Sequence, residues 1–138
     1  MEQSQKFSFK LSNFKNALND FKDLMEINLE DFSGKILDGL KNGQIQKFEC
    51  VTEATWKIIK AFLLIKHGIE VKTPKQSIKE FYNNKFIDEE LYLCLIEMID
   101  NRNLLSHIYD KETFEEIHSK LYKYLEVLNN ILVIVEND

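Results

Sequence analysis

The sequence predicts an all-α protein, an antiparallel up-and-down bundle of four long helices with one additional short helix. Three observations predict it. Apolar residues recur at alternating spacings of three and four over most of the 138 residues, which is the repeat of one helix face. Four Gly and one Pro leave little material for tight turns. The links between the periodic stretches are short, as in an antiparallel bundle. This length supports one hydrophobic core, so we expect a single domain over residues 1–138.

The first helix is expected over residues 11–25, and Phe7 can extend it at the N-terminal side. One face of this segment is apolar, which makes the helix amphipathic. The residues on that face are Leu11, Phe14, Leu18, Phe21 and Met25. Turn-forming pairs follow at Asp38-Gly39 and Asn42-Gly43. We therefore expect residues 30–43 to form a connection with room for one short helical turn.

The second helix is expected over residues 44–67, with an apolar stripe that begins at Ile45 and is widened by Trp56. Gly68 follows the stripe directly, and a glycine there supplies the left-handed turn that ends many helices. A polar seam runs beside the stripe. It consists of Glu49, Glu53, Lys57 and Lys60. Two acids one turn apart repel each other, so the seam is either solvated surface or faces a basic side chain of another helix.

Three further helices complete the predicted bundle. The short helix begins at Thr73-Pro74, a capping box with proline in the first helical position, and ends at Asn83-Asn84. Asp88 caps the fourth helix and, with the acids after it, complements the positive end of the helix dipole. The fifth follows a cap at Asp110 and carries a seven-residue apolar repeat, so we expect one continuous helix over residues 114–135.

The charge balance restricts the classes of partner. Lys and Arg together number 18 and Asp and Glu 23, which gives a net charge of −5. General nucleic-acid binders usually carry a basic patch on a basic domain, so this composition disfavours that class. Any activity on RNA would need a local basic cleft, with the acidic surplus elsewhere.

The cysteines and the apolar runs indicate a cytoplasmic protein. Cys50 and Cys94 are solitary in helical segments, and their spacing signals neither a zinc site nor a disulfide framework. We expect two reduced core thiols, no metal and no cofactor. The N-terminal residues lack the apolar core of a signal peptide. The longest apolar run, Ala61–Ile65, is too short to cross a membrane.

The stretch Asp100–Tyr109 carries the residues with the clearest chemical potential. The apolar register of the fourth helix runs through Leu91, Leu95 and Met98. Arg102 occupies the next position of that register, where an apolar side chain is expected. A buried guanidinium is costly unless it is paired, so Arg102 needs an acid, and Glu49 or Glu53 is the obvious candidate.

Asn103 and His107 are four residues apart, about 40° around a helix, so they share a face and can touch. Arg102 and His107 are roughly 140° apart on an ideal helix. They converge only if the helix ends between them, if the long arginine side chain sweeps round, or across a dimer interface. The alternative without chemistry is an arginine that ties neighbouring helices together and a histidine that caps a helix end.

Arg102 and Asn103, followed by His107 and Tyr109, resemble the signature of the HEPN superfamily, small helical bundles that include many metal-independent ribonucleases. Most of the chain also resembles the nucleotidyltransferase substrate-binding protein family. The matching elements are Ile45–Glu49, Glu53–Lys57, Gly68, Thr73-Pro74 and residues 102–109. The arginine–histidine element alone is short and would match by chance. Joined to the other elements in this order and spacing, it is specific.

The resemblance implies a helical bundle that dimerises, with the motif helices lining a cleft between protomers. It also implies a toxin–antitoxin pair in which this chain is an endoribonuclease toxin and a cognate minimal nucleotidyltransferase is its antitoxin. That partner would silence the toxin by attaching AMP to Tyr109. In this assignment His107 transfers protons, Arg102 binds the phosphate and Asn103 positions the groups.

The implied chemistry is self-consistent. Cleavage of RNA without a metal requires removal of the 2′-hydroxyl proton and stabilisation of charge on the phosphorane. A histidine suits the first task because it titrates near neutrality, and a guanidinium suits the second. Glu49 and Glu53 would support Arg102, and the sequence offers no plausible carboxylate cage for Mg²⁺.

Three hypotheses follow for the function. The chain is a dimeric ribonuclease toxin, a non-catalytic subunit that binds substrate or nucleotide for a two-component nucleotidyltransferase, or a structural bundle with satisfied polar groups. The Arg102 and His107 pair favours the first over the third. The acidic net charge favours the second, and an activity assay separates the first two.

Overall fold

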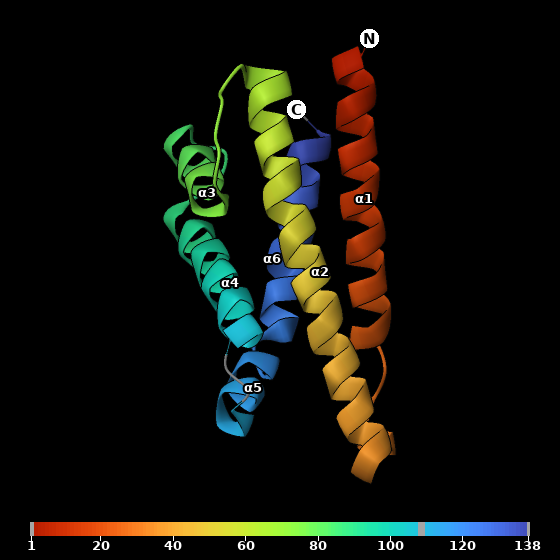
Figure 1. Ribbon diagram of the computed structural model, residues 1–138. Helices are drawn as coiled ribbons and strands as arrows, with labels where there is room; N and C mark the ends of the chain where they lie inside the picture. Colours follow the sequence, from red (N-terminus) through yellow and green to blue (C-terminus); the bar gives the residue numbers. More distant parts are fainter. Residues whose placement is uncertain (1, 108–109, 138) are drawn as a thin grey trace.

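The computed structural model describes residues 2–107 and 110–137 (Figure 1). Within these ranges the chain forms helices and no strand, which confirms the predicted all-α class. The elements are α1 (Glu2–Met25), the 3₁₀ turn η1 (Leu29–Asp31), α2 (Gly34–His67), α3 (Pro74–Asn83), α4 (Glu89–His107), α5 (Lys111–His118) and α6 (Leu121–Glu136). None of these helices combines the length and the apolar character that crossing a membrane requires.

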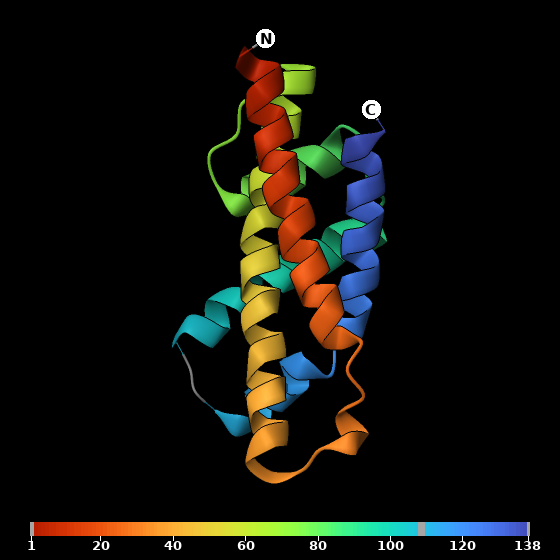
Figure 2. The same ribbon diagram turned by 90° about the vertical axis from the view of Figure 1, so that its right-hand side faces the viewer.

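The four long helices α1, α2, α4 and α6 run alternately in opposite directions (Figures 1 and 2). The first turn of α1 and the last turn of α6 therefore lie towards the same end of the bundle. Helix α3 is the predicted additional short helix, and α5 is a further short helix near the start of α6. The predicted up-and-down bundle is confirmed.

Aromatic side chains fill the centre of the bundle. The fully buried rings are Phe14, Phe21, Phe48, Phe62, Phe81 and Tyr124. Phe48 of α2 lies between α1 and α6, with ring centroids 6.3 Å from Phe21 and 5.3 Å from Tyr124. Burial of each such side chain stabilises the fold by roughly 1.5–3 kcal/mol relative to exposure. Helix α2, which carries the polar seam, is thus fixed against both α1 and α6.

The predicted helix signals are present in the structure. Helix α1 extends back beyond residue 11 and buries Phe7. The Thr73 hydroxyl accepts a hydrogen bond from the Gln76 amide at 3.1 Å, as a capping box requires. Gly68 ends α2 with φ 69°, the left-handed conformation expected of it. These signals hold because each satisfies backbone groups that a helix end leaves free.

Residues 34–43 are part of α2, so the prediction of a connection over residues 30–43 is wrong for most of that segment. The connection is confined to the short stretch around η1, and α2 begins at Gly34. Gly34 has a φ of 60°, whereas Gly39 lies within the helix. Contacts with α5, including an ion pair between Lys41 and Glu115 at 2.6 Å, favour the extended helix. They offset the cost of helical glycine, about 1 kcal/mol each.

The predicted fifth helix is two helices, α5 and α6, separated at Ser119-Lys120. The Ser119 hydroxyl donates to the Glu116 carbonyl at 2.6 Å, which satisfies part of the end of α5. Ile117 and Leu121 are buried on either side of the break. The apolar repeat therefore continues across a bend that spacing alone does not reveal.

The two thiols differ in burial. Cys94 is buried, whereas Cys50 is exposed, so the expectation of a core thiol is wrong for Cys50. Cys50 shares the outward side of α2 with Glu53 and Lys57, and all three line one hollow beside α1.

Candidate functional site

Arg102, Asn103 and His107 all lie on the last two turns of α4. The side chain of Asp88 accepts a hydrogen bond from the Leu91 amide at 2.9 Å and caps the start of this helix. The buried residues Leu95 and Met98 fix its rotation about its own axis. This register turns Arg102 towards α2, one turn after the last buried contact.

Arg102 forms an ion pair with Glu53 of α2, with Nη2 and Oε2 separated by 3.2 Å. The contact expected between Arg102 and the acid seam is therefore present. Both side chains are 34% exposed, so the pair lies at the edge of the helix interface, not in the core. Nη1 of Arg102 also donates a long hydrogen bond of 3.5 Å to Asn103. Its Nε is buried and has no hydrogen-bond partner among the described residues.

The two acids of the seam have different environments. Glu53 lies between two cations, because Lys57 approaches its other oxygen at 3.5 Å. Glu49, one turn earlier, has its pKa raised by burial, and the nearby positive charge of Arg102 opposes that shift. Glu53 therefore contacts the guanidinium directly, while Glu49 interacts with Arg102 only through the electrostatic attraction between their charges.

A polar network ties α4 to α6 one turn before Arg102. The Tyr124 hydroxyl donates to Glu97 at 2.5 Å and accepts from the Asn101 amide at 2.8 Å. Lys120 also approaches Glu97 at 3.0 Å. The hydrogen bond from Tyr124, with the contribution of Lys120, lowers the pKa of Glu97. Burial and the hydrogen bond to Glu97 raise the pKa of Tyr124. This network fixes the end of α4 that carries the motif.

His107 is exposed and is the last residue of α4. Because the helix is continuous from Arg102 to His107, these residues do not converge through a helix end between them. The arginine side chain turns towards Glu53 instead. In the part of the chain that the structure describes, His107 forms no hydrogen bond with Arg102 or Asn103. Tyr109, the expected AMP acceptor, lies outside the described residues.

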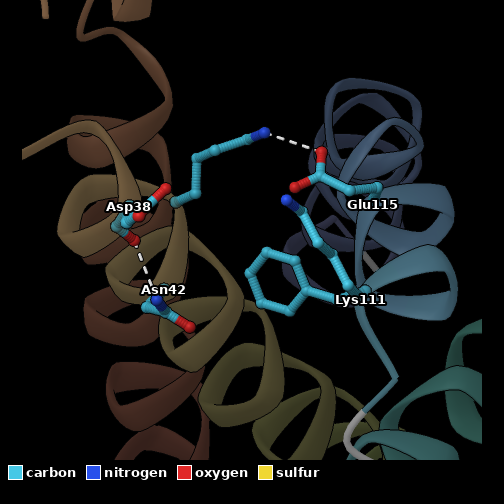
Figure 3. Close-up of a pocket in the computed structure, with 6 residues that line it drawn as sticks. Asp38, Asn42, Lys111 and Glu115 are labelled. Carbon is cyan, nitrogen blue, oxygen red and sulfur yellow. Dashed lines mark hydrogen bonds and ion pairs between the residues drawn. The ribbon is translucent and has the colours of Figure 1, made fainter. Parts of the chain in front are cut away.

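A second hollow lies between the start of α2 and α5, with a volume of about 360 Å³. Asp38 and Asn42 on one side face Lys111 and Glu115 on the other (Figure 3). Lys41 crosses the opening to Glu115, and this contact lowers the pKa of Glu115. Sequence reasoning missed this hollow because it assigned residues 30–43 to a connection.

The position of His118 off the apolar repeat of residues 114–135 predicts an exposed side chain. The structure shows it half-buried beside this hollow, so this prediction is wrong. Its Nε2 is 2.6 Å from the side-chain oxygen of Gln44, whose amide donates to the Leu24 carbonyl at 3.0 Å. Burial lowers the pKa of His118, and the charge of Lys41 lowers it further. The bend between α5 and α6 turns this side chain inward.

Comparison with known proteins shows which family and which solved structures this chain is similar to. The sequence matches, over residues 9–136, the family model described as nucleotidyltransferase substrate binding protein like. A crystal structure from Thermus thermophilus is similar, with a TM-score of 0.78 and 25% identity over 88% of this chain and 98% of that chain. Among proteins of curated function, none matches the sequence significantly.

Two further solved structures share the fold. One is a tri-AMPylated HEPN toxin of Shewanella oneidensis in complex with MNT antitoxin, with a TM-score of 0.74 and 14% identity over 96% of this chain and 97% of that chain. The other is a mutant of the toxin–antitoxin pair MntA-HpeT, with a TM-score of 0.76 and 15% identity over 96% of this chain and 98% of that chain.

Proposed function

This chain belongs to the nucleotidyltransferase substrate binding protein like family, and we propose that it is an endoribonuclease toxin of the HEPN type. It acts as a dimer without a metal ion, and a cognate minimal nucleotidyltransferase controls it in the cytoplasm. One observation carries the proposal: Arg102, Asn103 and His107 share the last two turns of α4, and Glu53 holds Arg102. The shared fold with a HEPN toxin solved with its antitoxin supports it.

The chemistry divides between the histidine and the arginine of the motif. His107 is exposed and can reach a 2′-hydroxyl, whose proton it removes so that the oxygen attacks the adjacent phosphorus. Arg102 presents N–H groups besides the one that Glu53 engages, and these stabilise the negative charge on the phosphorane. Asn103 adds a polar group beside the guanidinium. The bond to the 5′-oxygen then breaks, this oxygen takes a proton from water, and the products are a 2′,3′-cyclic phosphate and a 5′-hydroxyl.

A dimer would bring an Arg102 and a His107 together, which a single chain does not do. Arg102 and His107 of one chain project in directions roughly 140° apart on an ideal helix, and α4 does not break between them. Two copies that pack α4 about a twofold axis can place His107 of one beside Arg102 of the other. Each dimer then has two shared sites.

The partner is proposed to act on the segment after α4. A relative is described as tri-AMPylated and bound to MNT antitoxin, and Tyr109 follows the motif histidine by two residues. We expect the cognate nucleotidyltransferase with ATP to increase the intact mass of this chain by one or more AMP groups. The increase should be lost or reduced in Tyr109→Phe. An increase that Tyr109→Phe leaves unchanged would exclude Tyr109 as the acceptor.

A non-catalytic subunit is the second candidate function. The family's name, which is that of a substrate binding protein, favours it, as does the net charge of −5. In this case the chain presents a substrate or nucleotide to the transferase, and Arg102 binds phosphate without cleavage.

The deciding experiment measures RNA cleavage by the purified chain in EDTA. Wild type should release fragments with 2′,3′-cyclic phosphate ends from total bacterial RNA. His107→Ala should lower the rate by roughly a hundredfold or more and keep the helical circular dichroism spectrum, because an exposed side chain contributes little packing. His67→Ala, also exposed at a helix end, is the matched control and should cleave normally. Wild type that leaves RNA intact would favour the binding subunit.

A further inference from the structure

A groove lined by lysines runs between the first half of α1 and the second half of α2. It has a volume of about 350 Å³. Its described lining includes Lys6, Lys10, Lys57 and Lys60 around the apolar side chains of Trp56 and Leu64. The helices that form its walls lie side by side in both views (Figures 1 and 2).

The charge of this groove is opposite to that of the whole molecule. Half of the described residues that line it are lysines, and none of them is an acid, although the chain has a net charge of −5. In the hollow beside α5, by contrast, Lys41 faces Glu115 at 2.6 Å. Lys57 is paired with Glu53 at 3.5 Å. The other three lysines cluster in a lining that holds no acid, so they raise the local positive potential, which attracts polyanions.

The groove also presents an aromatic and apolar surface. The ammonium of Lys60 lies 5.9 Å from the centroid of the Trp56 ring. Trp56 is half-buried, and Leu64 remains 45% exposed. Proteins that bind single-stranded nucleic acid combine these two features, because cations follow the phosphates while bases stack on aromatic side chains.

The groove is continuous with the surroundings of Arg102. A neighbouring hollow of about 230 Å³ shares Lys10 and Lys57 with it and reaches Glu53. Glu53 holds Arg102 at 3.2 Å. The two hollows together therefore lead from the start of α1 to Glu53, the acid that holds Arg102.

We propose that this groove binds single-stranded RNA and directs the strand towards Arg102. The inference deepens the proposed ribonuclease function and rests on it. An unpaired strand fits better than a duplex, because only an unpaired strand offers its bases to Trp56 and Leu64. A second copy of the same groove is a poor occupant, because a twofold contact would bring lysines against lysines.

The experiment measures binding of a 2′-O-methyl single strand of about 12 nucleotides, within the usual range of site sizes. The blocked 2′-hydroxyl prevents cleavage, so binding is read separately from activity. Trp56 is the one tryptophan of the chain, so quenching of its fluorescence reports on the groove directly. The full chain is titrated by this signal and by anisotropy at several salt concentrations.

The test variant is Lys6→Gln/Lys10→Gln, and the matched control is Lys22→Gln/Lys35→Gln. The control removes the same charge away from the groove, with Lys22 in the last turn of α1 and Lys35 in the first turn of α2. We expect the test variant to bind roughly tenfold more weakly. Its salt slope should shrink by about 1.4, since each phosphate contact to a single strand contributes about 0.7. The control should bind like wild type.

Unchanged affinity and salt slope in the test variant would overturn the inference, even if wild type cleaves RNA. A dimeric wild type beside a monomeric test variant would also overturn it, because the groove would then be a subunit contact. The same holds if an acidic peptide of equal charge binds as tightly and quenches Trp56 equally. Salt-dependent quenching that the test variant loses, without cleavage by wild type, would uphold the groove while the ribonuclease function fails.

Discussion

At the scale of single residues, the ion pair between Arg102 and Glu53 links the motif helix to the centre of the bundle. Both side chains are about one-third exposed, at 34%. Solvent therefore screens the pair, and pairs of this kind contribute on the order of 1 kcal/mol or less to stability. Its main effect is orientation: Glu53 holds one edge of the guanidinium, so the remaining N–H groups keep a defined direction for a phosphate.

His118 is the histidine with the clearest electrostatic role in the fold. Its ring lies between Gln44 and Phe114, and Lys41 and Glu115 are the charged groups near it. Burial lowers its pKa below the ordinary value of 6.5. As the pH falls through 6.5, the unfolded chain takes up a proton at this position that the folded chain resists. Stability is therefore lost on acidification.

We expect His118→Gln to reduce the loss of stability between pH 7.5 and pH 5.5. Glutamine retains a polar group opposite Gln44 but takes up no proton in this range. Urea unfolding of both proteins at the two pH values measures the effect. Glu49, whose pKa is raised by burial, is present in both proteins, so its contribution cancels in the comparison. The pKa of Glu115 is lowered mainly by the hydrogen bond from Lys41, which the variant keeps. An equal loss in wild type and variant would show that His118 is not the group responsible.

The sequence predicted the residue contacts that follow from helical register and missed those that depend on a bend. Arg102 interrupts an apolar register, and a charge in that position requires an acid on the facing helix, so its pairing was predictable. His118 lies off the apolar repeat of a helix that was expected to be continuous. The bend at Ser119-Lys120 changes its direction, and no spacing rule carries that information.

At the scale of elements, α2 is the longest helix and contacts most of the others. Its C-terminal cap and apolar stripe were readable from sequence, because Gly68 and the periodic residues act locally. Its first turns were not, because Asp38-Gly39 and Asn42-Gly43 are typical of turns. Packing against α5 favours the helical conformation of residues 34–43. This packing includes the contact of Lys41 with Glu115, which are far apart in the chain, so local sequence patterns do not reveal it.

Two glycine substitutions in α2 test this assignment with opposite expected signs. Gly39 is inside the helix with open space around it, so Gly39→Ala should raise the free energy of unfolding by about 0.5–1 kcal/mol. Gly68 has a φ of 69° and equally open surroundings, so Gly68→Ala should lower it by about 1 kcal/mol or more. Denaturant unfolding measures both. A destabilising Gly39→Ala would indicate that residues 34–43 are not helical in solution.

At the scale of the whole molecule, the bundle separates the arginine and the histidine of its motif. Glu53 fixes Arg102 against α2, while His107 stands exposed at the end of α4. The proposed groove arrives at the arginine side of this arrangement. In the function that we propose, a complete ribonuclease site therefore includes a residue of a second protomer, and this is the proposal's central claim. Family resemblance predicted the dimer from sequence, and the unbroken α4 now supplies a geometric reason for it.

The most direct test mixes two inactive protomers. Arg102→Ala and His107→Ala chains carrying different tags are coexpressed, and the heterodimer is purified and assayed for RNA cleavage in EDTA. If each site takes its arginine from one protomer and its histidine from the other, the heterodimer contains one intact site of two. It should then recover about half of the wild-type rate, while each mutant homodimer stays inactive. A heterodimer as inactive as the two homodimers, beside an active wild type, would contradict the shared site.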